Sequence, residues 1–417
     1  MPTQQHFTDN LPKMASYIDT PEALNQLCAE LEHSDFIALD TEFLREKTYL
    51  PRLCLIQVAT TTTLAIIDPI ALADLDAFWK VLRNSAITKV FHSGRQDLEI
   101  FYEQCGLITT PLFDTQLAAT LLGYGDQIGY GALVEAECGI SLDKAHTRTD
   151  WTVRPLNPGQ LRYAADDVRY LVLLYQNIRK RLEQDERFGW LNEDFTAMTD
   201  PTGYGTLPEE AWKRVRGAQN LQGRPLSFLQ HLASWREQKA RSEDLPRRWI
   251  ISDEILLDLA RHPPRDLEHL RRIPNMEANV LRHYGHELIM LLRAITEMPA
   301  SLFTAANSRQ MPTPEQDALV DCLLAVVRVQ AITHGVGLAA LASRRDLEAL
   351  VLGELDSPLL HGWRRALGGE AVLDMLQGRA HLTVVDGRVL LRRQNLLKNE
   401  GKSSPTAKRV SVTQVAT

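Results

Sequence analysis

Hydrophobic periodicity in the first 195 residues predicts a segment that mixes helices and strands. Apolar residues recur at helical spacing over residues 21–31, where Thr20 can cap the helix and Pro21 takes its first position. Short apolar runs typical of strands follow at residues 36–40, 53–59 and 64–68. These runs predict an antiparallel three-stranded start to the domain.

Helical and strand patterns then alternate along the chain. Helices are expected at residues 72–83, 95–105 and 116–122, with short strands at residues 89–92 and 112–113. A long helix begins at Asn157-Pro158 and keeps an apolar stripe as far as Tyr175. We therefore predict a mixed α/β sheet flanked by helices over residues 1–195.

The pattern changes after residue 195. A linker rich in turn residues is expected at residues 196–207, and two all-α domains with a loosely shared helical pattern at residues 208–298 and 312–392. Two related helical modules explain this spacing, and so do two unrelated bundles. Residues 393–417 mix Lys and Arg with Ser, Thr and Gly, which predicts a disordered basic tail.

Composition narrows the class of protein. With 417 residues, 44% hydrophobic and 24% charged, the chain reads as an ordinary globular protein of several domains. Its five scattered cysteines include no C-x-x-C pair, which argues against a disulfide framework or zinc site and favours the cytoplasm. The N-terminus is polar, which gives no sign of secretion. No apolar run approaches the roughly 20 residues that a membrane span needs, so membrane insertion is not expected.

Charge is unevenly distributed between the two halves. Residues 1–200 carry 17 Lys and Arg against 29 Asp and Glu, whereas residues 201–417 carry 29 against 24. An acidic half can hold divalent cations and a basic half can lie on phosphates. An uneven solvated surface without functional meaning is the alternative.

Three separate segments supply candidate carboxylates. Asp40 and Glu42 lie two apart at the end of an apolar strand, so their side chains share one face. Asp97 is expected in the first turn of a helix capped by Ser93, with Gln96 completing a capping box. Carboxylate ligands favour Mg²⁺ or Mn²⁺. The alternatives are that Asp40 and Glu42 are solvated acids at a strand end, and that Asp97 compensates the helix dipole.

The long helix adds a second pair. Tyr163 and Asp167 are four residues apart and therefore lie on one face, about one turn from each other. Asp166 points about 100° away and is expected to be a solvated surface acid. A half-buried core tyrosine is the alternative for Tyr163.

The order of these motifs resembles the ribonuclease D family, in the tyrosine-bearing branch of the DEDD exonuclease superfamily. The shared segments are Leu39-Asp40-Thr41-Glu42-Phe43, Phe91-His92-Ser93-Gly94-Arg95-Gln96-Asp97-Leu98, Tyr163-Ala164-Ala165-Asp166-Asp167-Val168, and the shorter Leu55-Ile56-Gln57, Phe113-Asp114-Thr115-Gln116 and Trp151-Thr152-Val153-Arg154-Pro155-Leu156. The two helical stretches resemble HRDC domains. The second is more divergent, with Val327 where the first has Trp235.

The resemblance implies a ribonuclease H-like fold and a two-metal 3′–5′ exoribonuclease. It assigns two divalent ions, Mg²⁺ or Mn²⁺, to Asp40, Glu42, Asp97 and Asp167, with Asp40 bridging both ions and Tyr163 orienting the attacking water. The expected substrates are 3′ ends of transfer RNA precursors and other structured RNAs, and the products are nucleoside 5′-monophosphates. HRDC modules are expected to assist RNA binding. We expect a monomer with no small-molecule organic cofactor.

Six further residues are candidates for substrate binding. Phe43 follows the first acids and is expected to support the terminal base or sugar, while Gln57 and His92 are expected to reach the phosphate or ribose. Arg247, Arg248 and Trp249 combine positive charge with a ring that can stack on bases. Core packing or a solvated cationic surface is the alternative for each residue.

Two rival functions stay open at this point. A DNA-directed 3′–5′ exonuclease would use identical acids and metals. An RNA-binding scaffold with a disabled nuclease domain would have lost an acid, and the sequence retains all four motif acids.

Overall fold

In the computed structural model, the described residues are 11–12, 14–106, 108–143, 149–205, 207–299 and 312–394. The chain divides into two compact units, the first formed by residues 1–311 with 335–340 and the second by residues 312–334 with 341–417. Almost all of the expected basic tail lies outside the described residues. No helix among the described residues is long and apolar enough to cross a membrane.

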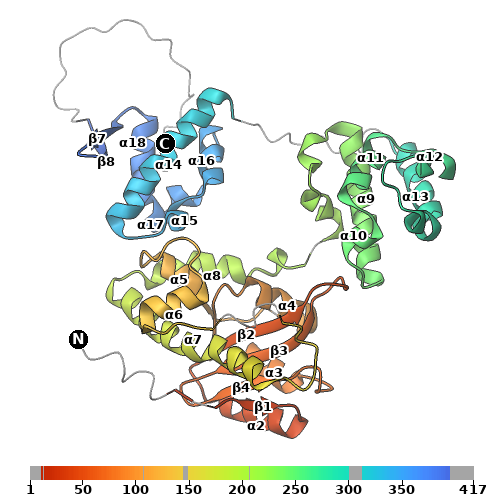
Figure 1. Ribbon diagram of the computed structural model, residues 1–417. Helices are drawn as coiled ribbons and strands as arrows, with labels where there is room; N and C mark the ends of the chain where they lie inside the picture. Colours follow the sequence, from red (N-terminus) through yellow and green to blue (C-terminus); the bar gives the residue numbers. More distant parts are fainter. Residues whose placement is uncertain are drawn as a thin grey trace, which may run out of the picture. The chain divides into compact units, whose positions relative to one another are not determined.

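A six-stranded sheet forms the centre of the N-terminal domain (Figure 1). Its order is β1-β4-β3-β2-β5-β6, in which β4, β3 and β2 are antiparallel and the remaining pairs are parallel. The strands are β1 (Ser16–Ile18), β2 (Phe36–Leu44), β3 (Arg52–Ala59), β4 (Leu64–Ile67), β5 (Thr88–Phe91) and β6 (Leu112–Asp114). The predicted mixed sheet and its antiparallel start are confirmed.

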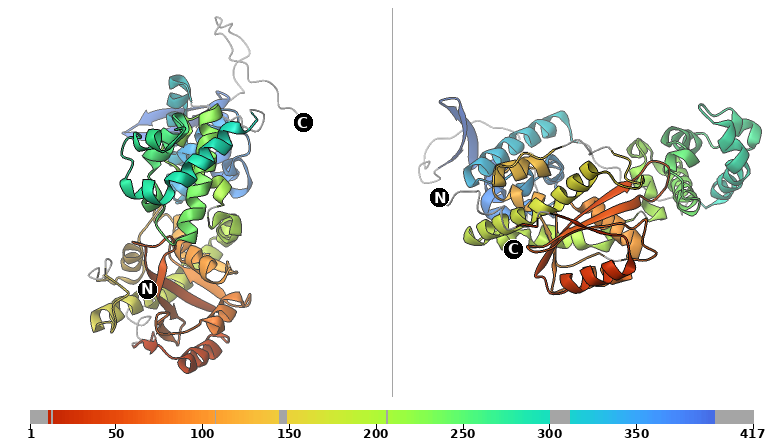
Figure 2. Two further views of the ribbon diagram at one scale, coloured as in Figure 1. Left: turned by 90° about the vertical axis from the view of Figure 1, so that its right-hand side faces the viewer. Right: turned by 60° about the horizontal axis from the view of Figure 1, so that its bottom comes forward.

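Helices cover both faces of this sheet (Figures 1 and 2). Alternation sends Ile37, Leu39 and Val58 to the face where they pack with side chains of α2 to α4. The long helix α7 lies on the opposite face against β2, β3 and β4. The helices are α2 (Pro21–Leu31), α3 (Asp76–Arg83), α4 (Arg95–Cys105), α5 (Thr115–Thr120), α6 (Tyr130–Cys138), α7 (Pro158–Gln184) and α8 (Asn192–Thr199).

Local capping signals explain where α2 and α7 begin. The Thr20 side chain accepts a hydrogen bond from the amide of Ala23 at the start of α2. At α7, Asn157 and Gln160 form a complete capping box and proline occupies the first turn. Both helix starts agree with the sequence prediction.

The capping box predicted for α4 is wrong. Ser93 has a φ of 60°, and the residue that caps the helix is Gly94, without a side-chain cap. The Gly94 amide instead donates to Asp114 Oδ2 at 2.8 Å. A Cβ on Gly94 would lie 2.4 Å from Phe91 Cβ, so the close turn between β5 and α4 requires glycine.

A helical bundle follows in the first unit. Its helices are α9 (Gly223–Ser242), α10 (Arg247–Ile250), α11 (Asp253–Arg261), α12 (Leu267–Arg271) and α13 (Ala278–Glu297). Arg236 is buried at 4% exposure and donates to Asp253 Oδ1 at 2.7 Å, while the Trp235 indole donates to Glu287. The Trp-Arg pair therefore stabilises the bundle from within.

The second unit is also mainly helical. It contains α14 (Pro314–His334), α16 (Arg344–Val351), α17 (Gly362–Arg364), α18 (Glu370–Leu376) and the hairpin β7 (Ala380–Val385) with β8 (Arg388–Arg393), while α15 (Leu338–Leu341) spans the boundary between the units. The hairpin departs from the all-α prediction for residues 312–392. Its tight Asp386-Gly387 turn has positive φ at both residues, as type I′ hairpins require.

Candidate active site

The first two acids stand on β2, the strand that pairs with both β3 and β5. Asp40 lies opposite Gln57 of β3, and Glu42 lies opposite Leu55. The pairing register shifts between Glu42 and Phe43, which breaks the regular ladder beside the acids. Asp40 and Glu42 therefore project from one face of the sheet next to an irregular strand end.

Asp97 reaches the same region from the first turn of α4. Its side chain is buried, with the residue 7% exposed, and Thr41 Oγ1 donates to Asp97 Oδ1 at 2.5 Å. This hydrogen bond ties the helix to β2 across 56 residues of sequence. Asp97 is thus fixed by tertiary contact as well as by its helix.

Asp167 and Tyr163 come from α7, one turn apart as predicted. Together with Asp166, Arg162, Gly159, Leu142 and Asp143 they line a small hollow of about 140 Å³. The Tyr163 ring lies 5.9 Å from the ring of Trp151, measured between centroids. Asp166 is half-buried and ion-paired with Arg169, so the expectation of a freely solvated acid is wrong.

The electrostatic surroundings of Asp40 and Glu42 connect the acids of β2 with those of α4 and α7. Burial raises the pKa of Asp40 well above its ordinary value, and the charges of Asp97, Asp167 and Glu42 raise it further. Burial, then Asp167 and Asp97, raises the pKa of Glu42 to about 8. Asp40 and Glu42 therefore both lie within electrostatic reach of Asp97 and Asp167.

The remaining two acids are perturbed in the same direction. Burial raises the pKa of Asp97 to about 6, although the hydrogen bond from Thr41 opposes this rise. Burial and the neighbouring Asp166 raise the pKa of Asp167 to about 8. Within the described residues, no group of three or more His, Cys, Asp or Glu side chains is arranged so that it could hold a metal ion as it stands.

Comparison with known proteins identifies the family. A 3′-5′ exonuclease family model matches residues 15–183, and an HRDC domain model matches residues 226–292. The ribonuclease D of Sphingobium indicum is 38% identical over 381 residues, which covers 90% of this chain and 98% of that protein. The ribonuclease D of Bartonella henselae is 36% identical, with 90% and 94% covered. The chain belongs to the ribonuclease D family.

Solved structures agree with this family. The crystal structure of Escherichia coli RNase D, described as an exoribonuclease involved in structured RNA processing, matches with a TM-score of 0.78 and 33% identity, covering 88% of this chain and 99% of that one. The catalytic core of RRP6 from Trypanosoma brucei shares the fold, with a TM-score of 0.54 at 23% identity. This member of the ribonuclease D family is a 3′–5′ exoribonuclease, and the predicted exonuclease domain and HRDC region are confirmed.

Two of the candidate substrate residues, His92 and Gln57, have surroundings that do not favour direct contact with a substrate. The ring nitrogens of His92 lie 3.0 Å from Thr115 Oγ1 and 3.0 Å from the carbonyl oxygen of Ile128. Gln57 is fully buried, and neither atom of its amide has a hydrogen-bond partner among the described residues. Direct contact of either side chain with a substrate would require rearrangement.

Phe43 and the three candidates of the HRDC region have different surroundings. Phe43 is half-buried against the core between the sheet and α2 to α4. Arg247 is ion-paired with Glu237, whereas Trp249 is 56% exposed and lines a hollow of about 510 Å³ with Arg248. Arg248 and Trp249 can therefore meet a nucleic acid, but Arg247 holds the protein together.

Tyr130 is a residue beside the site that the sequence analysis did not find. It stands at the start of α6, a helix without a clear apolar stripe, and its hydroxyl donates to the Asp166 carbonyl oxygen at 2.7 Å. Burial and the charges of Asp167 and Asp40 raise its pKa well above the ordinary value. Tyr130 thus packs next to the carboxylates and fixes α6 against α7.

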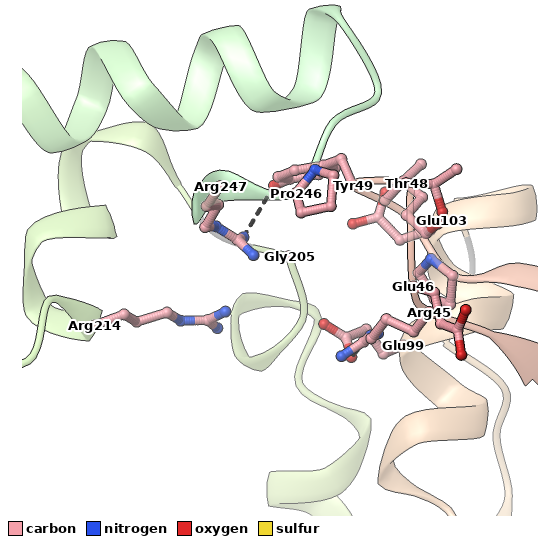
Figure 3. A pocket seen from close by; sticks show the side chains of 12 residues that line it. Arg45, Glu46, Thr48, Tyr49, Glu99, Glu103, Gly205, Arg214, Pro246 and Arg247 are labelled. Atoms are coloured by element: carbon pink, nitrogen blue, oxygen red, sulfur yellow. Dashed lines mark hydrogen bonds and ion pairs between the residues drawn. The ribbon is translucent and has the colours of Figure 1, made fainter. Parts of the chain in front are cut away.

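A third hollow, of about 230 Å³, lies beside the segment that follows β2 (Figure 3). The Tyr49 hydroxyl donates to Glu237 of α9, and the Arg247 guanidinium lies 4.7 Å from the Tyr49 ring centroid. Arg214 points its guanidinium into the hollow from the other side (Figure 3). The strand that carries Asp40 and Glu42 is therefore continuous with a segment anchored in the HRDC region.

Proposed function

We propose that this chain trims RNA from its 3′ end by a two-metal mechanism and releases nucleoside 5′-monophosphates. The observation that supports the proposal is that the charges of Asp97, Asp167 and Glu42 all act on Asp40, while Thr41 of the same strand binds Asp97 directly. Buried like charges repel, and hard divalent cations relieve this repulsion. The donor set, four carboxylates, fits Mg²⁺ or Mn²⁺ in its chemistry.

Four carboxylates and one phenol would share the chemistry. Asp40, Glu42, Asp97 and Asp167 would hold two divalent cations, with Asp40 contacting both because the other three acids all perturb it. When bound, such ions activate water and stabilise the leaving 3′-oxygen. Tyr163 would orient the attacking water through its hydroxyl group, a role that does not require an ionised phenol.

Thr41 and Tyr130 support these groups from within the protein. The Thr41 hydroxyl donates to one Asp97 oxygen and so orients this carboxylate. Tyr130 holds the backbone of α7 at Asp166, next to Asp167. Both contacts pre-position carboxylates on different elements, and such positioning is what metal-assisted hydrolysis requires of the protein.

The proposed substrates are 3′ ends of transfer RNA precursors and other structured RNAs. The similarity to an E. coli exoribonuclease involved in structured RNA processing supports this choice. The exposed Trp249 and Arg248 offer a stacking ring and a cation for RNA. Activity as a monomer in the cytoplasm stays part of the proposal.

Digestion of a 3′-extended transfer RNA tests the function. With Mg²⁺ or Mn²⁺ we expect shortening from the 3′ end with nucleoside 5′-monophosphates as products, and with a chelator no shortening. A matched DNA strand should be degraded more slowly. Faster loss of the DNA, or equal hydrolysis in the chelator, would contradict the proposal.

A further inference from the structure

A hollow lined by arginines lies in the first helical bundle, and it shares no lining residue with the hollow beside Trp249. Its walls come from the first turn of α9, the end of α11 with the loop after it, and the last turns of α13. Four arginines line it, namely Arg224, Arg261, Arg265 and Arg293. We call this site the arginine hollow.

Charge in the arginine hollow is strongly one-sided. Glu297 is the one acid among its described lining residues. Arg261, Arg265 and Arg293 are exposed, and none of them forms an ion pair with an acidic side chain in the described part of the chain. Two other arginines of the bundle are paired, Arg236 with Asp253 and Arg272 with Glu268. Arg261, Arg265 and Arg293 thus gather positive charge that no acidic side chain among the described residues neutralises by an ion pair.

Contacts with the protein hold two of these arginines in place. Arg224 Nη2 donates to the Thr296 carbonyl oxygen at 2.9 Å, and its Cζ lies 5.8 Å from the Phe228 ring centroid. Arg293 Nη2 donates to the Arg265 carbonyl oxygen at 3.3 Å. A guanidinium has five N–H donors, so a bond to one carbonyl leaves Arg293 able to bind an anion.

Helix stability does not account for this clustering. A basic side chain is favourable near the C-terminal end of a helix, which explains Arg261 in the last turn of α11. Arg224 lies instead in the first turn of α9, where a positive charge is unfavourable, and Arg265 lies in the loop before α12. Binding of a negatively charged ligand would explain why arginine occupies all of these positions.

We propose that the arginine hollow binds the phosphodiester backbone of RNA, upstream of the 3′ end that is being hydrolysed. Guanidinium groups match phosphate oxygens in geometry and charge. The volume of about 810 Å³ exceeds the need of one phosphate and accommodates a stretch of backbone. Phe228, Pro263 and Pro264 supply an apolar floor for sugar edges. The site rests on the proposed function, because it serves the same RNA substrate.

The test measures RNA binding by the full chain in chelator, which prevents hydrolysis. The variant R261Q/R265Q should bind a labelled single-stranded RNA about tenfold more weakly at moderate salt, and two RNAs of unrelated sequence should be affected equally. The slope of log K against log salt should become shallower by about 1.4, because two phosphate contacts are lost.

The variant R271Q/R282Q is the matched control, since it removes the same charge from exposed positions of the same bundle outside the hollow. We expect its slope to change by less than half as much. Equal changes in both variants, or wild-type binding by R261Q/R265Q, would overturn the proposal. The proposal would also be overturned if R261Q/R265Q bound polyglutamate more weakly than wild type but bound RNA equally well. The hollow would then be a docking site for an acidic protein.

Failure of the proposed function can be recognised separately. Wild-type chain that degrades no short oligoribonucleotide with Mg²⁺ would refute the nuclease proposal, whereas the binding measurement in chelator decides the arginine hollow. If both variants degrade that oligonucleotide like wild type and only R261Q/R265Q binds long RNA weakly, the site is assigned. If R261Q/R265Q also loses cleavage of the short substrate, the site is not a separate upstream contact and the proposal is wrong.

Discussion

At the scale of single residues, the proposed chemistry depends on buried carboxylates whose negative charges repel one another. Asp40→Asn or Asp167→Asn should each lower the rate of RNA hydrolysis by about 10³-fold, because each removes a charged ligand from the reacting site. RNA affinity in chelator and the circular dichroism spectrum should be unchanged. Turnover measured on purified variants provides the check.

Asp166→Asn is the control for the Asp167 variant. It alters the neighbouring residue and removes an ion pair with Arg169, but it leaves all four proposed ligands in place. We expect most of the activity to remain. Equal loss in both variants would mean that the charge of the segment, and not Asp167 itself, matters.

The raised pKa values of the acids predict how stability varies with pH. Glu42 and Asp167 have pKa values of about 8 in the folded chain, whereas ordinary carboxyl groups titrate near pH 4. The folded state therefore binds more protons than the unfolded state, so without metal the free energy of unfolding should fall as pH rises from about 4 to about 8.

Thermal unfolding in chelator at several pH values measures this effect. Mg²⁺ should raise the melting temperature most at the upper end of the window, where the acids are ionised. Glu42→Gln should flatten the pH dependence. A melting temperature that rises from pH 5 to pH 8 in chelator would contradict the electrostatic account.

Gln57 gives a prediction about stability alone. Its amide is fully buried opposite Asp40 without a partner among the described residues, which is an unfavourable state for a polar group. Gln57→Leu should raise the free energy of unfolding by about 1 kcal/mol. Thr41→Val, which removes the donor to Asp97, provides a contrast and should not stabilise. A destabilised Gln57→Leu variant would show that the amide has a partner in solution.

At the scale of elements, the segment after β2 connects the catalytic strand to the helical bundle. The Tyr49 hydroxyl donates to Glu237, which is only 1% exposed, and the Tyr49 ring packs against the core of the bundle. Tyr49→Phe should lower the free energy of unfolding by about 2 kcal/mol, because a buried carboxylate loses a donor. Tyr49→Ala should cost more, since ring packing is lost too.

Tyr170→Phe is the matched control in denaturant unfolding, because Tyr170 is also half-buried and its hydroxyl has no described partner. We expect no measurable change in that variant. If Tyr49→Phe behaved in the same way, the contact with Glu237 would contribute nothing to stability.

At the scale of the whole molecule, the two compact units predict a division of labour. A chain that ends at residue 311 keeps the exonuclease domain and the first helical bundle, and of the first unit it loses only residues 335–340. It should degrade short oligoribonucleotides at the full rate but bind structured RNA more weakly and with a shallower salt dependence. Gel-shift titrations with both chains test this. Equal affinity would remove residues 312–417 from RNA binding.

The sequence by itself predicted most of the elements of the exonuclease domain and identified the four acids as candidates. Apolar periodicity and capping residues act over one or two turns, so α2 and α7 begin where the sequence predicts. Side chains alternate along a strand, which placed Asp40 and Glu42 on one face without further information. The hairpin β7–β8 and helix α6 were not predicted, because short half-exposed segments carry weak periodicity.

Only the tertiary structure decided which groups meet. The contacts of Thr41 with Asp97, Tyr130 with α7, and Tyr49 with Glu237 join residues separated by 56, 36 and 188 positions. Strand order and helix packing set such contacts, and no local pattern encodes them. The same reason explains why Arg247 pairs with Glu237 inside the protein while the neighbouring Arg248 and Trp249 stay exposed.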